Sequence, residues 1–128
     1  MKVVWIALFK ESSRFDLVRG PQGVIGKARN LSFSLGLSEA EGKPWSNEFV
    51  IRMEMRTEDM PTNADPLLVT ELHYAVSFDR PKVDTVPLDI IWPFVRPDLI
   101  AQLRRYELPG DTIPLQLSEA NSKQDHEG

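Results

Sequence analysis

Few side chains in this sequence could do chemistry. The 128-residue chain has two histidines and no cysteine, which excludes disulfides and thiolate nucleophiles. His73 lies two residues from Glu71, and a histidine beside a carboxylate could act as a general base. On a strand these two residues share one face, where such a pair is far more often a solvated neighbour contact than a catalytic dyad. The other histidine, His126, lies in a polar C-terminal stretch.

Motifs and composition also argue against catalysis and nucleic-acid binding. The sequence has no P-loop, no G-x-G-x-x-G and no G-x-S-x-G motif. The net charge is −4, the pI is about 5.2, and Arg104-Arg105 is the main basic cluster. We therefore expect no enzyme, no metal or cofactor and no nucleic-acid partner. Abundant apolar and aromatic residues favour a binding protein, with a small-molecule binder or enzyme as the weakest alternative.

The N-terminal apolar run, Val3 to Phe9, is flanked by Lys2 and Lys10. Seven residues are too few to span a bilayer, and no signal-peptide cleavage pattern follows. We expect a strand covered on both faces near its start, in a cytoplasmic protein without stable membrane insertion.

Three further stretches alternate apolar and polar residues, as half-buried strands do. Short polar turns join them, which predicts antiparallel pairing. Between the first two strands, four Gly and Pro residues from Gly20 to Gly26 indicate a long crossover loop with Val24 and Ile25 inside it. The prediction is an α+β fold: a four-stranded antiparallel sheet with a long crossover loop and one main C-terminal helix. The three alternating stretches are Leu31 to Leu37, Phe49 to Arg56 and Leu67 to Asp79.

The helix is predicted from Pro93 to just before Pro109-Gly110. Its apolar residues recur at helical spacing, whereas Gln102 falls on the polar faces. The apolar series is Trp92, Val95, Leu99, Leu103 and Tyr106.

The run Ile90 to Val95 is apolar at every position, and a helix cannot turn six consecutive side chains toward one sheet. Two interpretations stay open. The run is an extended lead-in buried on both sides within the monomer, or Trp92 and Phe94 contribute to a subunit interface or a binding groove. Residues 1–117 make one domain, and 118–128, with one apolar residue, are expected to be a disordered tail.

Three short segments in the last third of the chain form a recognisable series: Ile91-Trp92-Pro93-Phe94-Val95-Arg96, Leu108-Pro109 and Ile113-Pro114-Leu115. They resemble the Leu-Phe-Pro-Tyr-Ala-Arg helix start and the Phe-Pro-x-Leu-x-Leu-x-Pro ending of the SecB family of bacterial protein-export chaperones. The likeness extends loosely over Ile6 to Leu117.

The resemblance implies an ATP-independent cytoplasmic holdase that binds unfolded precursor proteins before export and translocation. It implies a homotetramer, a dimer of dimers with the helices between subunits. The client-binding residues that it implies are Trp92, Phe94 and Leu99 of the helix, with Val24 and Ile25 of the crossover loop.

The resemblance also implies docking of the SecA motor ATPase on a sheet face that includes Asp16, Val69 and Glu71. The sequence departs from the family at Ser12, where an acidic residue is usual, and in the short connection from Arg80 to Asp89. Two alternatives remain: a SecB-like chaperone dedicated to one client such as an antitoxin, and a non-chaperone interface subunit of a larger assembly.

Overall fold

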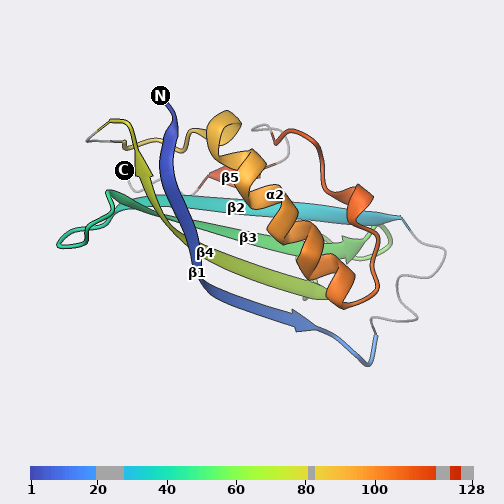
Figure 1. Ribbon diagram of the computed structural model, residues 1–128. Coiled ribbons are helices and arrows are strands. Elements are labelled where there is room, and N and C mark those ends of the chain that lie inside the picture. Colours follow the sequence, from blue (N-terminus) through green and yellow to red (C-terminus); the bar gives the residue numbers. More distant parts are fainter. Residues whose placement is uncertain (20–27, 81–82, 118–121, 125–128) are drawn as a thin grey trace.

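The computed structural model describes residues 1–19, 28–80, 83–117 and 122–124. Long strands come first, and the main helix follows them (Figure 1). The elements are β1 (Val3–Phe15), β2 (Arg29–Glu39), β3 (Asn47–Thr57), β4 (Leu68–Phe78), α2 (Leu88–Arg105), a 3₁₀ turn η1 (Gly110–Thr112) and β5 (Ser122–Gln124).

The sheet has the strand order β1-β4-β3-β2-β5, and the four long strands pair antiparallel. Strands β2, β3 and β4 form a meander joined by short turns, as the alternating pattern predicted. Strand β1 adds to the far side of β4, so β3 and β4 separate it from β2. This order explains why the chain between β1 and β2 must be long.

Helix α2 crosses one face of the sheet, and the core lies between them (Figure 1). The predicted fold, a four-stranded antiparallel sheet with a long crossover and one C-terminal helix, is confirmed for these elements. Alternate side chains of β2, β3 and β4 are buried against the helix. The core contributions from α2 are Ile91, Trp92, Val95, Leu99 and Leu103.

The predicted helix start at Pro93 is wrong, because α2 begins five residues earlier at Leu88. Pro93 and Pro97 therefore lie inside the helix, and each lacks the N–H that would bond the carbonyl four residues before it. The two carbonyls left without this partner belong to Asp89 and Pro93, which are both exposed residues. Water can hydrogen-bond there, so the helix continues through both prolines.

The helix ends in a Schellman motif. The N–H groups of Glu107 and Leu108 donate to the carbonyls of Arg104 and Leu103, and Glu107 takes a φ of 60°. The chain then reverses, and Gly110 approaches the helix so closely that an added Cβ would lie 2.6 Å from Ile100 Cγ2.

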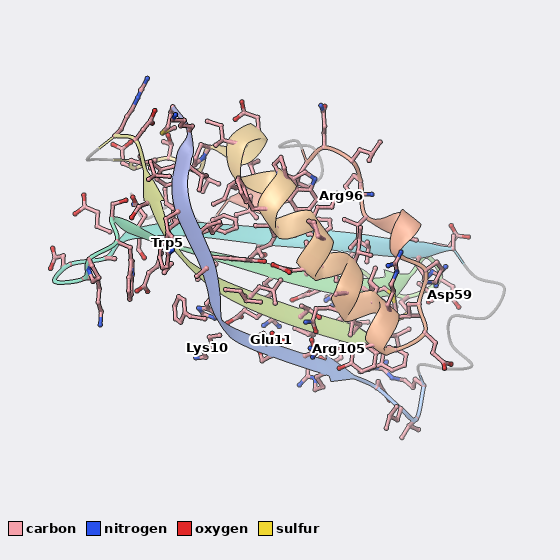
Figure 2. All side chains as sticks on the ribbon, in the orientation of Figure 1. Trp5, Lys10, Glu11, Asp59, Arg96 and Arg105 are labelled. Atoms are coloured by element: carbon pink, nitrogen blue, oxygen red, sulfur yellow. The ribbon has the colours of Figure 1, made fainter. Side chains whose placement is uncertain are left out.

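Residues 113–117, here called the strap, return along the N-terminal half of α2. Trp92 Nε1 and Arg96 Nε donate to the carbonyl of Pro114, at 3.2 and 3.0 Å, and Arg96 also donates to the carbonyl of Ile113. Figure 2 shows Arg96 on the side of the helix where the strap lies. Side chains of α2 therefore hold the strap against the helix.

Strand β1 is not covered on both faces, contrary to the expectation from its apolar run. Val4, Trp5 and Phe9 are 63%, 48% and 52% exposed. The physical reason is position: β1 is an edge strand, and its pairing with β4 shifts register between Val3 and Trp5 and between Leu8 and Lys10. Only part of an apolar edge strand can face the core.

The C-terminal stretch contains one described element. Ser122–Gln124 form β5, which pairs parallel with residues 33–35 of β2. At these three residues the structure differs from the expected disordered tail. The rest of 118–128 lies outside the described residues, so its disorder stays a prediction. Among the described helices, none combines the length and the apolar character needed to cross a bilayer.

Candidate functional site

The exposed side of the N-terminal half of α2 is the first candidate surface. Of the run Ile90 to Val95, the structure buries Ile91, Trp92 and Val95 and leaves Pro93 and Phe94 at the surface, with Phe94 47% exposed. The run is therefore helical and not an extended lead-in buried on both sides. Helical geometry gives the reason, since successive side chains point about 100° apart.

A pocket adjoins this surface between the start of α2 and the strap, with a volume of about 260 Å³. Leu115 of the strap is 79% exposed, whereas its neighbour Leu117 is buried. We call Pro93, Phe94 and Leu115 the helix-side surface. The pocket is lined by Leu88, Asp89, Trp92, Pro93, Leu115, Gln116 and Leu117.

Two of the sequence-derived client-binding residues lie in the core. Trp92 is 3% exposed and packs edge-on against Phe33, with ring centroids 5.8 Å apart, while Leu99 is fully buried. Both face the sheet because they occupy the apolar stripe of α2. In the single chain Leu99 has no surface to offer a client, and Trp92 contributes only to the lining of the pocket.

Val24 and Ile25 of the crossover loop lie outside the described residues. The structure instead presents Leu17 and Val18 at the beginning of that loop, 75% and 92% exposed. Sequence reasoning passed over them, although an apolar pair directly before a Gly- and Pro-rich loop was a signal that could have found them.

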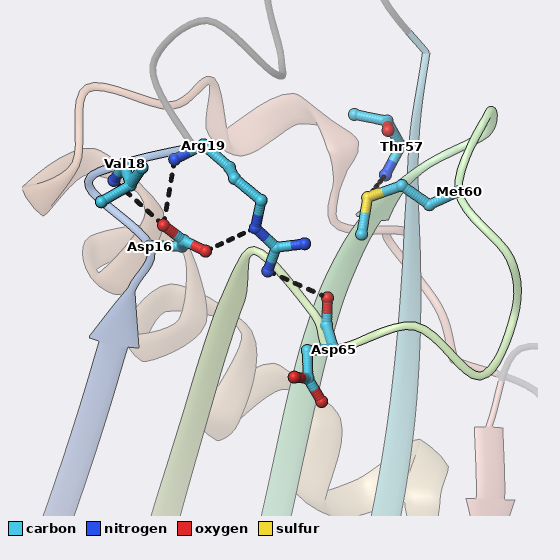
Figure 3. Close-up of polar contacts among 6 residues, drawn as sticks. All are labelled: Asp16, Val18, Arg19, Thr57, Met60 and Asp65. Carbon is cyan, nitrogen blue, oxygen red and sulfur yellow. Dashed lines mark hydrogen bonds and ion pairs between the residues drawn. The ribbon is translucent and has the colours of Figure 1, made fainter.

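The turn that carries Leu17 and Val18 is held by Asp16 (Figure 3). Its Oδ1 accepts the backbone N–H groups of Val18 and Arg19, both at 3.0 Å, and its Oδ2 accepts Arg19 Nε at 2.6 Å. These bonds, the Arg19 backbone N–H first, lower the pKa of Asp16 below its ordinary value. Arg19 also donates to the carbonyl of Asp65 in the loop between β3 and β4.

Val69 and Glu71 are the other residues of the expected motor-docking face. They lie two residues apart on β4, on the face of the sheet opposite α2, here called the helix-free face. Val69 is 8% exposed. Glu71 accepts a hydrogen bond from His73 at 2.8 Å and lies 3.5 Å from Arg52, and the His73 bond is the main cause of its lowered pKa. The structure thus brings Glu71 and Val69 together but leaves neither Asp16 nor Glu71 as an unpaired acid.

The ion pairs continue across β3 on the same face. Glu54 lies between Arg52 and Arg56, at 2.8 and 2.9 Å, and the Arg52 bond is the main cause of a lowered Glu54 pKa. These charged side chains therefore form a connected series of ion pairs from Glu71 on β4 to Arg56 on β3. Within the described part of the chain, no three His, Cys, Asp or Glu side chains gather as a metal site would require.

Aromatic side chains mark the β1 end of the helix-free face. Trp5 stacks on Trp45, with ring centroids 6.0 Å apart, and Phe9 meets the edge of His73 at 6.2 Å. We call Trp5 and Phe9 the β1-side surface; Figure 2 shows Trp5 on β1, away from α2. This surface was not predicted, because the apolar run of β1 indicated burial on both faces.

A part-buried polar seam fastens the C-terminal half of α2 to β1 and β4. Gln102, expected on a polar face, is instead 3% exposed. Its amide accepts from Ser13 at 2.6 Å and donates to Glu11 at 3.0 Å, and Ser13 also bonds Thr70 at 2.9 Å. Figure 2 shows Glu11 beside Arg105, which it meets at 3.1 Å.

Comparisons with solved structures give likenesses for this antiparallel sheet with a C-terminal helix. No protein-family model matches the chain, and no curated protein matches it. The structure is similar to that of the SecB-like chaperone Rv1957 of Mycobacterium tuberculosis in complex with a ChAD peptide from the Rv1956 HigA1 antitoxin. The TM-score is 0.46 and the identity is 17%, over 91% of this chain and 88% of that chain.

Proposed function

We propose that this protein is an ATP-independent cytoplasmic chaperone that holds unfolded polypeptides on exposed apolar surfaces. The observation that carries the proposal is the set of large apolar side chains open to solvent on a well-packed chain. They are Val4, Trp5, Phe9, Leu17, Val18, Phe94 and Leu115.

These side chains suit promiscuous binding of apolar segments. Each large apolar side chain removed from water contributes about 1.5–3 kcal/mol, so a few contacts offset the cost of ordering an extended client. Such contacts require apolar area and no particular sequence, which is how a holdase can accept many clients. Of the sequence-derived client-binding residues we retain Phe94, with Val24 and Ile25 as further expected members. To these we add three exposed residues: Leu115 of the strap, and Leu17 and Val18 at the beginning of the crossover. Trp92 would contribute through the pocket wall.

The clients that we propose are precursor proteins awaiting export, as the sequence resemblance implies. A single dedicated client such as an antitoxin is the alternative within the same activity. Both clients would present apolar segments to the same surfaces, so client identity must come from affinity comparisons between precursors and candidate antitoxins.

Assembly into a homotetramer is part of the proposal. A dimer of dimers needs two different self-contacting surfaces. The chain offers the β1-side surface and part of the helix-side surface, and the part of the helix-side surface that the subunit contact leaves open would hold the client. The same surfaces would also suit a permanent partner, which is the competing proposal of an interface subunit. That alternative differs in requiring one stoichiometric partner and no affinity for unrelated unfolded chains.

SecA docking would use the helix-free face around Val69 and Glu71, with Asp16 at the end of β1. Binding a basic partner there would require Glu71 to exchange Arg52 and His73 for the partner's cations. Glu71→Lys should then abolish docking while client holding persists. Unchanged SecA binding by this variant would exclude the proposed docking face.

The test of the main proposal is suppression of aggregation. Denatured citrate synthase is diluted into buffer with the purified protein, with and without ATP, and light scattering is followed. The proposal expects suppression at near-stoichiometric ratios, equal in both conditions. No suppression at a tenfold molar excess would overturn it.

A further inference from the structure

The edge of β2 that faces away from β3 carries the short strand β5. Strand β2 pairs with β3 along all 11 of its residues. On its other side, the pairing within the described part of the chain is with β5, at Phe33, Ser34 and Leu35. An edge strand that presents unpaired backbone groups is a template for another strand. Here a short segment of the protein's own C-terminal stretch already occupies the middle of that template.

We propose that the β2 edge is a strand-addition site for an extended client segment, and that β5 is a displaceable internal occupant of it. This inference rests on the proposed holdase function, because it assigns one place where a client backbone binds. Backbone pairing is independent of sequence, which suits a protein whose clients vary, and neighbouring side-chain pockets would add preference.

The side chains of β2 define what an added strand would meet. On the helix side, Phe33 and Leu35 are buried. On the helix-free face, the small residues Ser34, Gly36 and Ser38 form one side of a trough of about 290 Å³, which Arg52 and Glu71 also line. An added strand alternates its side chains between these two sides, so the site fits an extended segment with a bulky residue facing the trough.

The internal occupant is short enough to be displaced. Three paired residues form few backbone bonds, and their ordering opposes the gain from those bonds. A longer client strand could pair with more of the 11 residues of β2. Occupation by β5 would also protect the edge from pairing with other copies when no client is present.

The test compares the full chain with three variants. One ends at Leu117, one is Lys123→Pro, and the matched control is Lys123→Ala. Proline removes a backbone donor from the centre of β5, whereas alanine keeps it, so a backbone-paired β5 should be lost only in the proline variant. The truncated variant should fold, because it keeps every residue of the described core cluster, which extends to Leu117.

Hydrogen exchange is measured on β2, and binding is measured with reduced, carboxymethylated α-lactalbumin as a permanently unfolded probe. Truncation and Lys123→Pro should each speed exchange of the outward-facing amides in residues 33–35 by at least tenfold and tighten probe binding about threefold or more. Lys123→Ala should do neither. A synthetic 118–128 peptide should restore protection to the truncated variant.

Unchanged exchange in both disrupted variants would overturn the inference, and so would faster exchange without tighter probe binding. If no form of the protein binds the probe although β2 exchange responds to truncation, the proposed function fails while β5 pairing stands. If every form binds the probe equally, the proposed function stands and the strand-addition site fails.

Discussion

At the scale of single residues, burial separates side chains that hold the fold from side chains that are free to bind. Phe94 and Leu35 are both large apolar residues, but Phe94 is 47% exposed and Leu35 is 1% exposed. Sequence periodicity placed Leu35 in the core correctly. It could not divide the run Ile90 to Val95, because every residue in that run is apolar.

Phe94→Ala should weaken holding of unfolded protein several-fold while lowering the free energy of unfolding by clearly less than the ~3–5 kcal/mol typical of a core Phe truncation. Leu35→Ala is the matched core variant and should cost about 2–5 kcal/mol. Denaturant midpoints and aggregation suppression are measured at equal folded concentration. Phe94 is not a client-binding residue if its variant unfolds as readily as Leu35→Ala, or holds clients at full strength.

Glu54 gives a prediction about acid stability. Its pKa is lowered by hydrogen bonds from Arg52 and then Arg56, relative to the ordinary value of 4.5. A carboxylate with a depressed folded-state pKa contributes stability above its unfolded pKa, and this contribution is lost as pH falls through the folded value. Stability should therefore decline below about pH 4.5.

Glu54→Gln removes this titration. The variant should show a shallower stability loss below that pH and, because the pair is partly solvent-exposed, a loss of at most about 1 kcal/mol at pH 7. Glu41→Gln, in the exposed turn before β3, is the control. Urea unfolding between pH 3 and pH 7 provides the measurement, and identical pH profiles for Glu54→Gln and the unmodified protein would refute the assignment.

At the scale of elements, α2 is joined to the sheet by packing along its apolar stripe and by the polar seam at Gln102. The apolar stripe was predicted from helical spacing, and the buried faces of the strands were predicted from their alternation of apolar and polar residues. The seam was not predicted, because it depends on the second register shift of β1, which comes just before Glu11 and Ser13, the residues that bond Gln102. A register shift depends on tertiary pairing and leaves no periodic trace in the sequence.

Gln102→Ala should lower the free energy of unfolding by about 1–3 kcal/mol, since Gln102 is buried and its loss leaves Ser13 and Glu11 without their amide partner in two part-buried hydrogen bonds. Gln116→Ala, on the exposed strap, should change it by no more than about 0.5 kcal/mol. Chemical denaturation of both variants checks the difference. Equal effects would show that the seam does not fasten α2.

The start of α2 and the exposure of β1 were also beyond sequence reasoning, for related reasons. Pro93 looked like a first helical residue. The carbonyl that lacks its N–H belongs to the exposed residue Asp89, however, and water can donate a hydrogen bond there instead. The run Val3 to Phe9 looked buried, but sheet order put it at an edge. Both depend on which faces solvent reaches, and that is settled only by the assembled fold.

At the scale of the whole molecule, two apolar surfaces on different sides of one chain predict self-association. The protein should sediment as a tetramer, or at least a dimer, at micromolar concentration. Phe9→Lys, on the β1-side surface, should reduce the mass to that of the assembly held by the helix-side surface alone. A monodisperse monomer of the unmodified protein would contradict this prediction.

The central claim is that the folded protein binds unfolded polypeptide by burying apolar surface. Isothermal titration with reduced, carboxymethylated α-lactalbumin at several temperatures tests it directly, with native α-lactalbumin as the control. We predict saturable binding of the unfolded form only, with a negative heat-capacity change because apolar area leaves water. Absence of binding, equal binding of the native control, or a heat-capacity change near zero would contradict the account.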